Sequence, residues 1–93
     1  MRRRYVVRGV VQGVNFRNNA VTEARRVGVT GRVWNQVDGA VGCVVEGDAA
    51  ALDRFAEWLG RGPRSARVEA VDATDLPGEA RFGDFRIAWD AVD

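Results

Sequence analysis

The spacing of apolar residues changes from a period of two to a period of 3.6, and it does so twice along this chain of 93 residues. A period of two is typical of a strand with one buried face, and a period of 3.6 of a helix with an apolar stripe. Residues alternate from Arg3 to Val11, and a helical stripe then runs from Phe16 to Val27. Because a second helical stripe follows later, the pattern predicts two similar halves.

Each expected helix also has a recognisable end. Gly28 is a natural stop for the first helix, and Asp48 is a good N-cap for the second, which is expected to end near Leu59. Between the middle strands, Asn35 to Gly39 has the composition of a hairpin turn. The expected elements are strands over residues 3–11, 29–34, 40–46 and 66–74, helices over 16–27 and 48–59, and a short last strand through Phe85, Ile87 and Trp89.

This order predicts an α+β, ferredoxin-like fold with βαββαβ topology. Both helices are expected on one face of an antiparallel sheet, with the other face left to solvent. A chain of this length forms one domain, which we expect to span residues 1–93. The predicted fold alone indicates no particular function.

The composition narrows the possible chemistry. Hydrophobic residues make up 46% and charged residues 29%, as in a folded globular protein, and a net charge of +1 gives little support to broad nucleic-acid binding. The chain has no histidine, which excludes Ser-His and Cys-His nucleophile pairs.

The single cysteine, Cys43, lies in a strand pattern, so we expect it to be buried and structural, without a disulfide or a zinc ion. No apolar run is long enough to span a membrane, and we expect a cytoplasmic protein.

The segment from Gly9 to Arg17 is the strongest functional candidate. It joins a strand to a helix and contains two glycines, so its N–H groups can approach a ligand closely. Such a loop at a helix N-terminus suits an anion, and Arg17 could grip two oxygens of a phosphate. The segment lacks the Gly-Lys-Ser/Thr of a P-loop and the third glycine of a dinucleotide fingerprint, so a tight structural turn remains an alternative.

The exact residues of this segment resemble a signature of the acylphosphatases, small enzymes that hydrolyse carboxyl-phosphate anhydrides. A second family motif is recognisable further along, and the resemblance covers nearly the whole chain. The two motifs are Gly9-x-Val11-Gln12-Gly13-Val14-x-Phe16-Arg17 and Gly28-x-x-Gly31-x-Val33-x-Asn35-x-x-Asp38-Gly39, and the match continues through Glu46-Gly47, Pro63, Ser65-Ala66 and Phe85-x-Ile87.

The resemblance implies hydrolysis of a small acyl phosphate without a metal or other cofactor. It implies that Arg17 holds the phosphate and that Asn35 orients the attacking water. Positioning and charge neutralisation supply most of the catalysis in phosphoryl transfer, and a carboxylate leaves readily. The proton acceptor stays open, with a phosphate oxygen as one candidate. The expected phosphate-binding residues are Gln12, Gly13, Val14, Asn15, Phe16 and Arg17, through their backbone N–H groups.

Three features depart from the family's usual pattern. Arg32 stands where a tryptophan often follows the motif glycine, and Trp34 takes a place beside Asn35 that is often polar. Asn18-Asn19 follow Arg17 where larger side chains are frequent. None of the three replaces a proposed catalytic group, but each adjoins the site or the open sheet face.

Several other residues are expected to be structural. Gln12 and Asn15 should contribute their backbone more than their side chains, and Asp38-Gly39 should shape a turn. The run Arg2-Arg3-Arg4 is typical of a solvated chain end. The three tryptophans, Trp34, Trp58 and Trp89, are expected to be packing residues.

Two other functions compete with acyl phosphate hydrolysis. One is a nucleic-acid-binding module that uses Arg4, Arg8, Arg32 and Trp34 on the open sheet face, although base stacking usually needs several exposed aromatic side chains. The other is an inactive relative that binds phosphate or an acyl phosphate without turnover. We expect a monomer that acts on a small molecule and binds neither nucleic acid nor a membrane.

Overall fold

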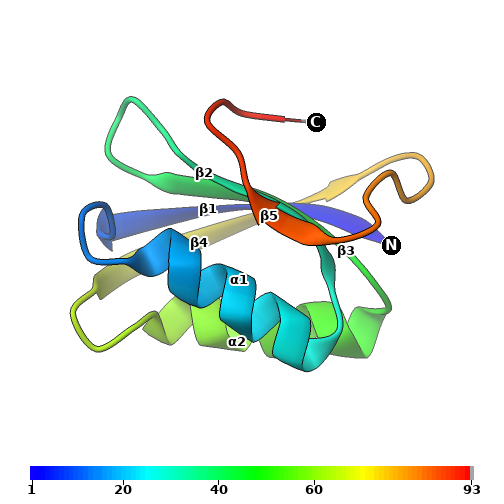
Figure 1. Cartoon of the computed structure of the whole chain (residues 1–93), viewed down its shortest axis with the longest axis horizontal. Coiled ribbons are helices and arrows are strands. Elements are labelled where there is room, and N and C mark those ends of the chain that lie inside the picture. The colour runs from blue at the N-terminus through cyan, green and yellow to red at the C-terminus, as the bar shows by residue number, and fades with distance from the viewer. Residues whose placement is uncertain (93) are drawn as a thin grey trace.

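Two helices cover one face of a five-stranded sheet (Figure 1). The computed structural model describes residues 1–92, and the chain fills an extent of 32 × 23 × 20 Å. The elements are β1 (Arg2–Val10), α1 (Phe16–Val27), β2 (Thr30–Asn35), β3 (Val41–Glu46), α2 (Ala49–Arg61), β4 (Arg67–Leu76) and β5 (Phe85–Ile87).

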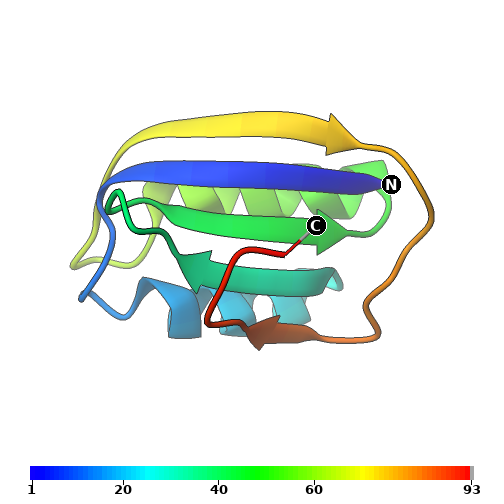
Figure 2. The same ribbon diagram turned by 90° about the horizontal axis from the view of Figure 1, so that it is seen from above.

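The strands lie in the order β4-β1-β3-β2-β5, as the view onto the sheet shows (Figure 2). The first four pair antiparallel, which confirms the predicted ferredoxin-like arrangement with both helices on one face. β5 adds a parallel edge, with Phe85 opposite Gly31 and Ile87 opposite Val33. The sheet is therefore mixed, and the parallel edge is an addition to the predicted topology.

Both helices have the ends that their sequences predict. Gly28 ends α1 in the left-handed region, with φ of 86°, and its N–H donates to Ala24 O. At the start of α2, Asp48 caps the helix by accepting a 2.8 Å hydrogen bond from the N–H of Ala51. Within residues 1–92, no helix is long and apolar enough to cross a membrane.

The core fills the space between the helices and the sheet. Alternate residues of the central strands point into it, as the period of two predicts. Phe55 of α2 packs against Phe85 of β5 with ring centroids 5.5 Å apart, and Cys43 is fully buried as expected. The fully or nearly fully buried side chains of this core include Tyr5, Val7, Val11, Phe16, Ala20, Ala24, Val33, Val41, Cys43, Val45, Leu52, Phe55, Leu59 and Phe85.

The outer face of the sheet is covered in part, contrary to the expectation that it would be left to solvent. The chain after β5 crosses this face (Figures 1 and 2). Arg4 Nη2 donates to Val92 O there at 3.3 Å. Trp34 and Val44 are buried, with exposed fractions of 2% and 0%, although both alternate with core residues. Trp34 is therefore a packing residue, as predicted, but on the face opposite the helices.

Two predictions about individual side chains are wrong. Trp89 is not a packing residue, because β5 ends at Ile87 and the Trp89 side chain is 85% exposed. Arg2 is not part of a solvated chain end. It is 5% exposed, and its Nε donates to Glu46 Oε2 at 2.8 Å, because β1 and β3 are paired there and the loop after β4 folds over both.

Candidate active site

Three connections meet at one end of the sheet. They are the loop between β1 and α1, the β2–β3 hairpin and the loop between α2 and β4 (Figures 1 and 2). We call residues 11–15, which form the first of these, the cradle loop. Ser65, in the loop before β4, donates from its Oγ to Val14 O at 2.9 Å and ties the two loops together.

The backbone of the cradle loop alternates between left-handed and other conformations. Gly13 has φ of 74° and Asn15 has φ of 64°, so both are left-handed, while Val14 between them is not. Such alternation turns neighbouring N–H groups toward one side and forms an anion-binding concavity. Asn15 tolerates this conformation better than most residues, and its own polar groups are used locally. Its Oδ1 accepts from Asn18 Nδ2 at 2.6 Å, and its main-chain oxygen accepts from Asn19 Nδ2 at 2.8 Å.

The N–H groups of this region have no acceptor in the part of the chain that the structure describes. Among residues 1–92, no hydrogen bond is donated by a backbone N–H from residue 12 to residue 18, and the first bond of α1 runs from Asn19 N to Asn15 O. The start of a helix also carries a partial positive charge from its aligned peptide dipoles. The cradle loop and the first turn of α1 therefore offer a concentrated set of donors to an anion.

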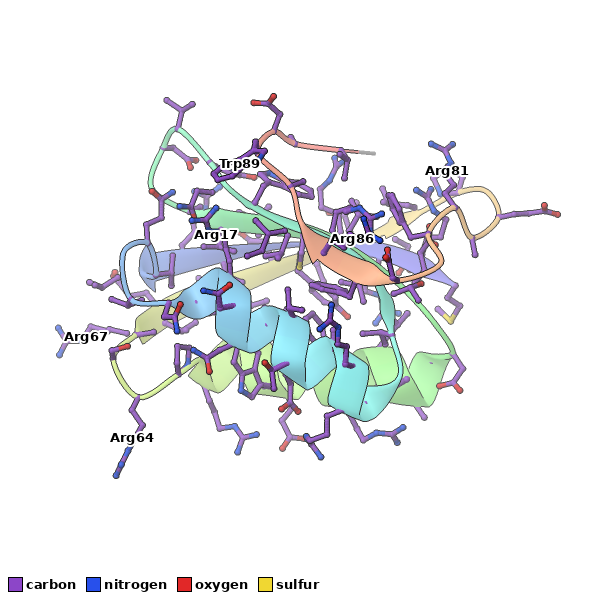
Figure 3. All side chains as sticks on the ribbon, in the orientation of Figure 1. Arg17, Arg64, Arg67, Arg81, Arg86 and Trp89 are labelled. Carbon is purple, nitrogen blue, oxygen red and sulfur yellow. The ribbon has the colours of Figure 1, made fainter. Side chains whose placement is uncertain are left out.

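Arg17 adds a full positive charge to these donors. Its half-buried side chain rises from the first turn of α1 toward Trp89 (Figure 3), and its Cζ lies 6.0 Å from the centroid of the Trp89 ring. Among the ion pairs formed by residues 1–92, none includes Arg17. The guanidinium is thus held beside an aromatic ring, with its donors available to a ligand.

Asn35 lies across from the cradle loop at the end of β2. Its Oδ1 is buried and accepts no hydrogen bond from any group in residues 1–92. A buried acceptor without a partner is rare in folded proteins and often marks a functional position. The Asn35 carboxamide can both accept a hydrogen bond from a water molecule and donate one to a neighbouring oxygen.

A cavity of about 150 Å³ brings these groups together. Of the phosphate-binding and catalytic residues expected from the sequence, Gly13, Asn15, Phe16, Arg17 and Asn35 line it. Gln12 and Val14 do not, although their N–H groups belong to the same loop. The full lining within the described residues is Val11, Gly13, Asn15, Phe16, Arg17, Asn18, Asn35 and Ile87, in which Arg17 is the one charged side chain.

The sequence did not identify three of these lining residues, nor the contact of Trp89 with Arg17. Val11 and Ile87 stood in the motif matches as strand residues without a role in the site, and Asn18 was noted as a departure from the family pattern, also without such a role. For Trp89 a usable signal was present. It lies two residues beyond Ile87, so the alternation that began at Phe85 placed both on the same side of the chain.

The groups that a nucleic-acid-binding module would use are engaged within the protein. Trp34 is buried, so it offers no exposed ring for a base to stack on. Arg8 pairs with Asp38 at 3.1 Å and Arg32 with Asp84 at 2.9 Å. Arg4 contacts the main chain of residue 92.

The fold and the site together define a class of protein: a small α+β domain in which the loop before the first helix and an asparagine at the end of β2 line one cavity. The family model described as Acylphosphatase matches residues 3–87. This chain belongs to the acylphosphatase family.

Individual relatives agree with the family assignment. The acylphosphatase of Mannheimia succiniciproducens is 42% identical over 94% of this chain and 97% of its own length. That of Anaeromyxobacter dehalogenans is 44% identical over 96% of each chain. The crystal structure of acylphosphatase from Bacillus subtilis superposes with a TM-score of 0.90, at 32% identity, over 95% of this chain and 98% of that one.

Proposed function

We propose that this chain hydrolyses acyl phosphates to a carboxylate and inorganic phosphate in the cavity between the cradle loop and Asn35. One observation carries the proposal: Gly13, Asn15, Phe16 and Arg17, whose backbone N–H groups have no acceptor within residues 1–92, line one cavity together with Asn35, whose buried Oδ1 has no donor there. Membership of the acylphosphatase family supports the same reaction and makes the chain a hydrolase.

The N–H groups of residues 12–17 bind the oxygens of the phosphoryl group in this scheme. They are fixed by the backbone before the substrate arrives, so they stabilise the charge that spreads over these oxygens without having to reorganise. Arg17 contacts two of the same oxygens through its planar fork. Because amides and a guanidinium supply the positive potential, the scheme needs no metal ion.

Asn35 orients the attacking water. As the water oxygen forms a bond to phosphorus, the bond from phosphorus to the acyl oxygen breaks and its electron pair leaves with the carboxylate. The polar side chains that line the cavity are Asn15, Arg17, Asn18 and Asn35, and none of these accepts a proton near neutral pH. We therefore assign the water proton to an oxygen of the transferred phosphate.

The test is phosphate release from benzoyl phosphate by the full chain in the presence of a chelator. Arg17→Ala and Asn35→Ala should each lower kcat/KM by roughly 10²–10³-fold or more, as expected when a group that stabilises the transition state is lost. Arg25→Ala is the matched control, since Arg25 is an exposed arginine on the same helix outside the cavity. Full activity in both site variants would refute the assignment of Arg17 and Asn35.

The same preparation separates the two rival functions. An inactive relative would bind phosphate and release none from the acyl phosphate. A nucleic-acid-binding module would bind an oligonucleotide in a salt-dependent way and show no hydrolysis. The proposed enzyme releases phosphate and gives no such binding.

The remaining proposals concern where and in what form the chain acts. We propose a monomer in the cytoplasm that acts on a small molecule, without a nucleic acid or a membrane as partner. Burial raises the pKa of the Cys43 thiol to about 12, so this cysteine is a structural residue suited to a reducing compartment. Gel filtration with light scattering tests the monomer, since a dimer would double the mass of 10.2 kDa.

A further inference from the structure

The side chain of Gln12 connects the two parts of the proposed site. Its Nε2 donates to Gln36 O at 2.7 Å and to Ala40 O at 2.9 Å. Gln12 belongs to the cradle loop, and Gln36 directly follows Asn35 in the β2–β3 hairpin. One carboxamide therefore reaches from the phosphate-binding loop to the peptide next to the water-orienting residue.

Both carbonyls also accept a hydrogen bond within the hairpin. Gln36 O accepts from Gly39 N at 3.2 Å, and Ala40 O accepts from Gln36 N at 2.8 Å. A carbonyl oxygen has two lone pairs, so Gln12 occupies the second acceptor position on each. Within the described residues, these two bonds are the only hydrogen bonds between residues 11–15 and residues 35–41.

The antiparallel ladder between β1 and β3, which pairs Val7 with Val41, holds the strands of the hairpin in the sheet, and a further side-chain contact joins β1 to the hairpin turn. Arg8 and Asp38 form an ion pair whose side chains are each 50% exposed, and such a pair contributes about 0–1 kcal/mol. Gln12, in contrast, is partly buried, and its two bonds run to fixed main-chain atoms. The ladders place Asn35 opposite Val41 and Val41 opposite Val7, and beyond the end of β1 the cradle loop is held to the hairpin by Gln12 more than by the surface pair.

We infer that Gln12 is a positioning residue, which sets the distance and angle between the cradle and the Asn35 carboxamide. This inference rests on the proposed function of the site. In-line attack requires the water and the phosphorus to be aligned, and a displacement of about 1 Å can lower a rate roughly 10²-fold. Gln12 thus contributes its side chain to alignment, in addition to the backbone role that the sequence predicts.

Ser65 supplies a matched control, because it is a second tether on the same loop. Its Oγ bonds to Val14 O but makes no hydrogen bond to the β2–β3 hairpin within the described residues. Ser65→Ala therefore loosens the cradle loop by a similar amount without disconnecting it from Asn35. Any effect that depends on Asn35 should appear with Gln12 variants and be absent with Ser65→Ala.

The experiment measures acyl phosphate hydrolysis by Gln12→Met in the full chain. Methionine keeps the size of the side chain but cannot donate to the two carbonyls. We expect kcat to fall roughly 10–100-fold. KM and the inhibition constant of inorganic phosphate should stay within about threefold, because the cradle N–H groups remain.

A double-mutant cycle then separates positioning from a general structural role. In an Asn35→Ala background, Gln12→Met should lower kcat by less than about a further twofold, because the carboxamide that Gln12 positions is gone. Ser65→Ala should lower activity by the same factor in both backgrounds. Equal losses for Gln12→Met in both backgrounds, or an unchanged kcat in the single variant, would overturn the inference.

Two results are kept apart by this design. If the wild-type chain releases no phosphate from acyl phosphates, the proposed function fails and the inference fails with it. If the wild type is active, Asn35→Ala is impaired and Gln12→Met is not, only the inference fails. Should Gln12→Met not fold, Gln12→Asn tests the same point, since its carboxamide is one methylene too short to reach both carbonyls.

Discussion

The buried ion pair between Arg2 and Glu46 leads to a prediction about stability that is separate from catalysis. The two side chains are 4% and 1% exposed, and Arg2 Nε lies 2.8 Å from Glu46 Oε2. The other carboxylate oxygen accepts from Arg81 N at 2.7 Å and from Phe82 N at 2.9 Å. Arg2 Nη1 also donates to Pro77 O at 2.8 Å, so the pair holds both ends of the loop between β4 and β5.

We predict that Glu46→Gln lowers the free energy of unfolding by about 3 kcal/mol. Loss of one partner from a buried ion pair costs roughly 3–5 kcal/mol, because the other charge stays buried without compensation. The lower value applies here, since the substituted side chain keeps an oxygen for the N–H groups of Arg81 and Phe82. The total free energy of unfolding of a domain of this size is roughly 5–15 kcal/mol, so the predicted loss is a large share of it.

The assay is urea unfolding followed by tryptophan fluorescence and circular dichroism. With a slope of roughly 1–2 kcal/mol per molar urea, the midpoint should fall by about 2 M. The double variant Arg2→Leu/Glu46→Gln should recover much of the loss, because no buried charge remains. A loss below about 1 kcal/mol, or single-variant losses that simply add, would refute the argument.

The same carboxylate predicts how stability depends on pH. Burial raises the pKa of Glu46, but the guanidinium of Arg2 and the N–H groups of Phe82 and Arg81 outweigh this and hold it below its ordinary value. The stability it contributes is therefore fully present above the unfolded pKa of about 4.3 and is lost as the pH falls through the folded pKa. The unfolding free energy of Glu46→Gln should decline less steeply in acid than that of the wild type. Asp38 and Asp84, whose pKa values are also lowered, contribute an acid-dependent decline to the wild type and the variant alike. An equally steep decline of the unfolding free energy in the two proteins would contradict the prediction.

Two further substitutions test the site and the sheet. Trp89→Ala should raise KM for an acyl phosphate about two- to fivefold and leave the melting temperature unchanged, because an exposed cation–π contact with Arg17 is worth roughly 0.5–1 kcal/mol. Val37→Ala is its control: it also removes an exposed apolar side chain and should change neither KM nor the melting temperature. Gly31→Ala should destabilise the fold severely, since its φ is 150° and an added Cβ would lie 1.9 Å from Val44 O. Gly60→Ala is its control: it lies on α2 with nothing within 4 Å of an added Cβ, so it should stabilise the protein by about 0.5–1 kcal/mol in the same thermal unfolding measurement.

Local patterns predicted the elements well, and pairing between distant elements less well. The bounds of α1 are those expected, because its apolar stripe and the stop at Gly28 are both local features. The parallel edge strand β5 depends on its partner β2, which no periodicity within residues 85–87 can identify. Arg2 shows the same limit. A run of three arginines reads as a solvated end, and only the pairing with Glu46, 44 positions away, explains its burial.

The structure places most of the predicted site residues around one cavity, and it adds contacts between them that the sequence did not predict. Arg17 and Asn35 came from the family motifs, and the structure brings both to one cavity. Gln12 was expected to act through its backbone, because nothing in the sequence shows which carbonyls its side chain can reach. Its two acceptors lie 24 and 28 positions further along the chain, so the contact exists only once the hairpin is folded against the cradle loop.

The buried acceptors at the two ends of the sheet differ, since Glu46 is hydrogen-bonded and Asn35 Oδ1 is not, and this difference bears on how the proposed catalysis is sustained. At the Glu46 end, a buried carboxylate is satisfied by three donors and holds a long loop in place. At the cradle end, the N–H groups of residues 12–18 and the buried Oδ1 of Asn35 have no partner within residues 1–92, and for the buried Oδ1 an unmade hydrogen bond costs about 1–3 kcal/mol. Unpaired donors and acceptors are what a phosphoryl group and a water molecule would bind. Stabilising contacts at the opposite end, together with the tethers from Gln12 and Ser65, offset that cost without occupying the groups that the reaction needs.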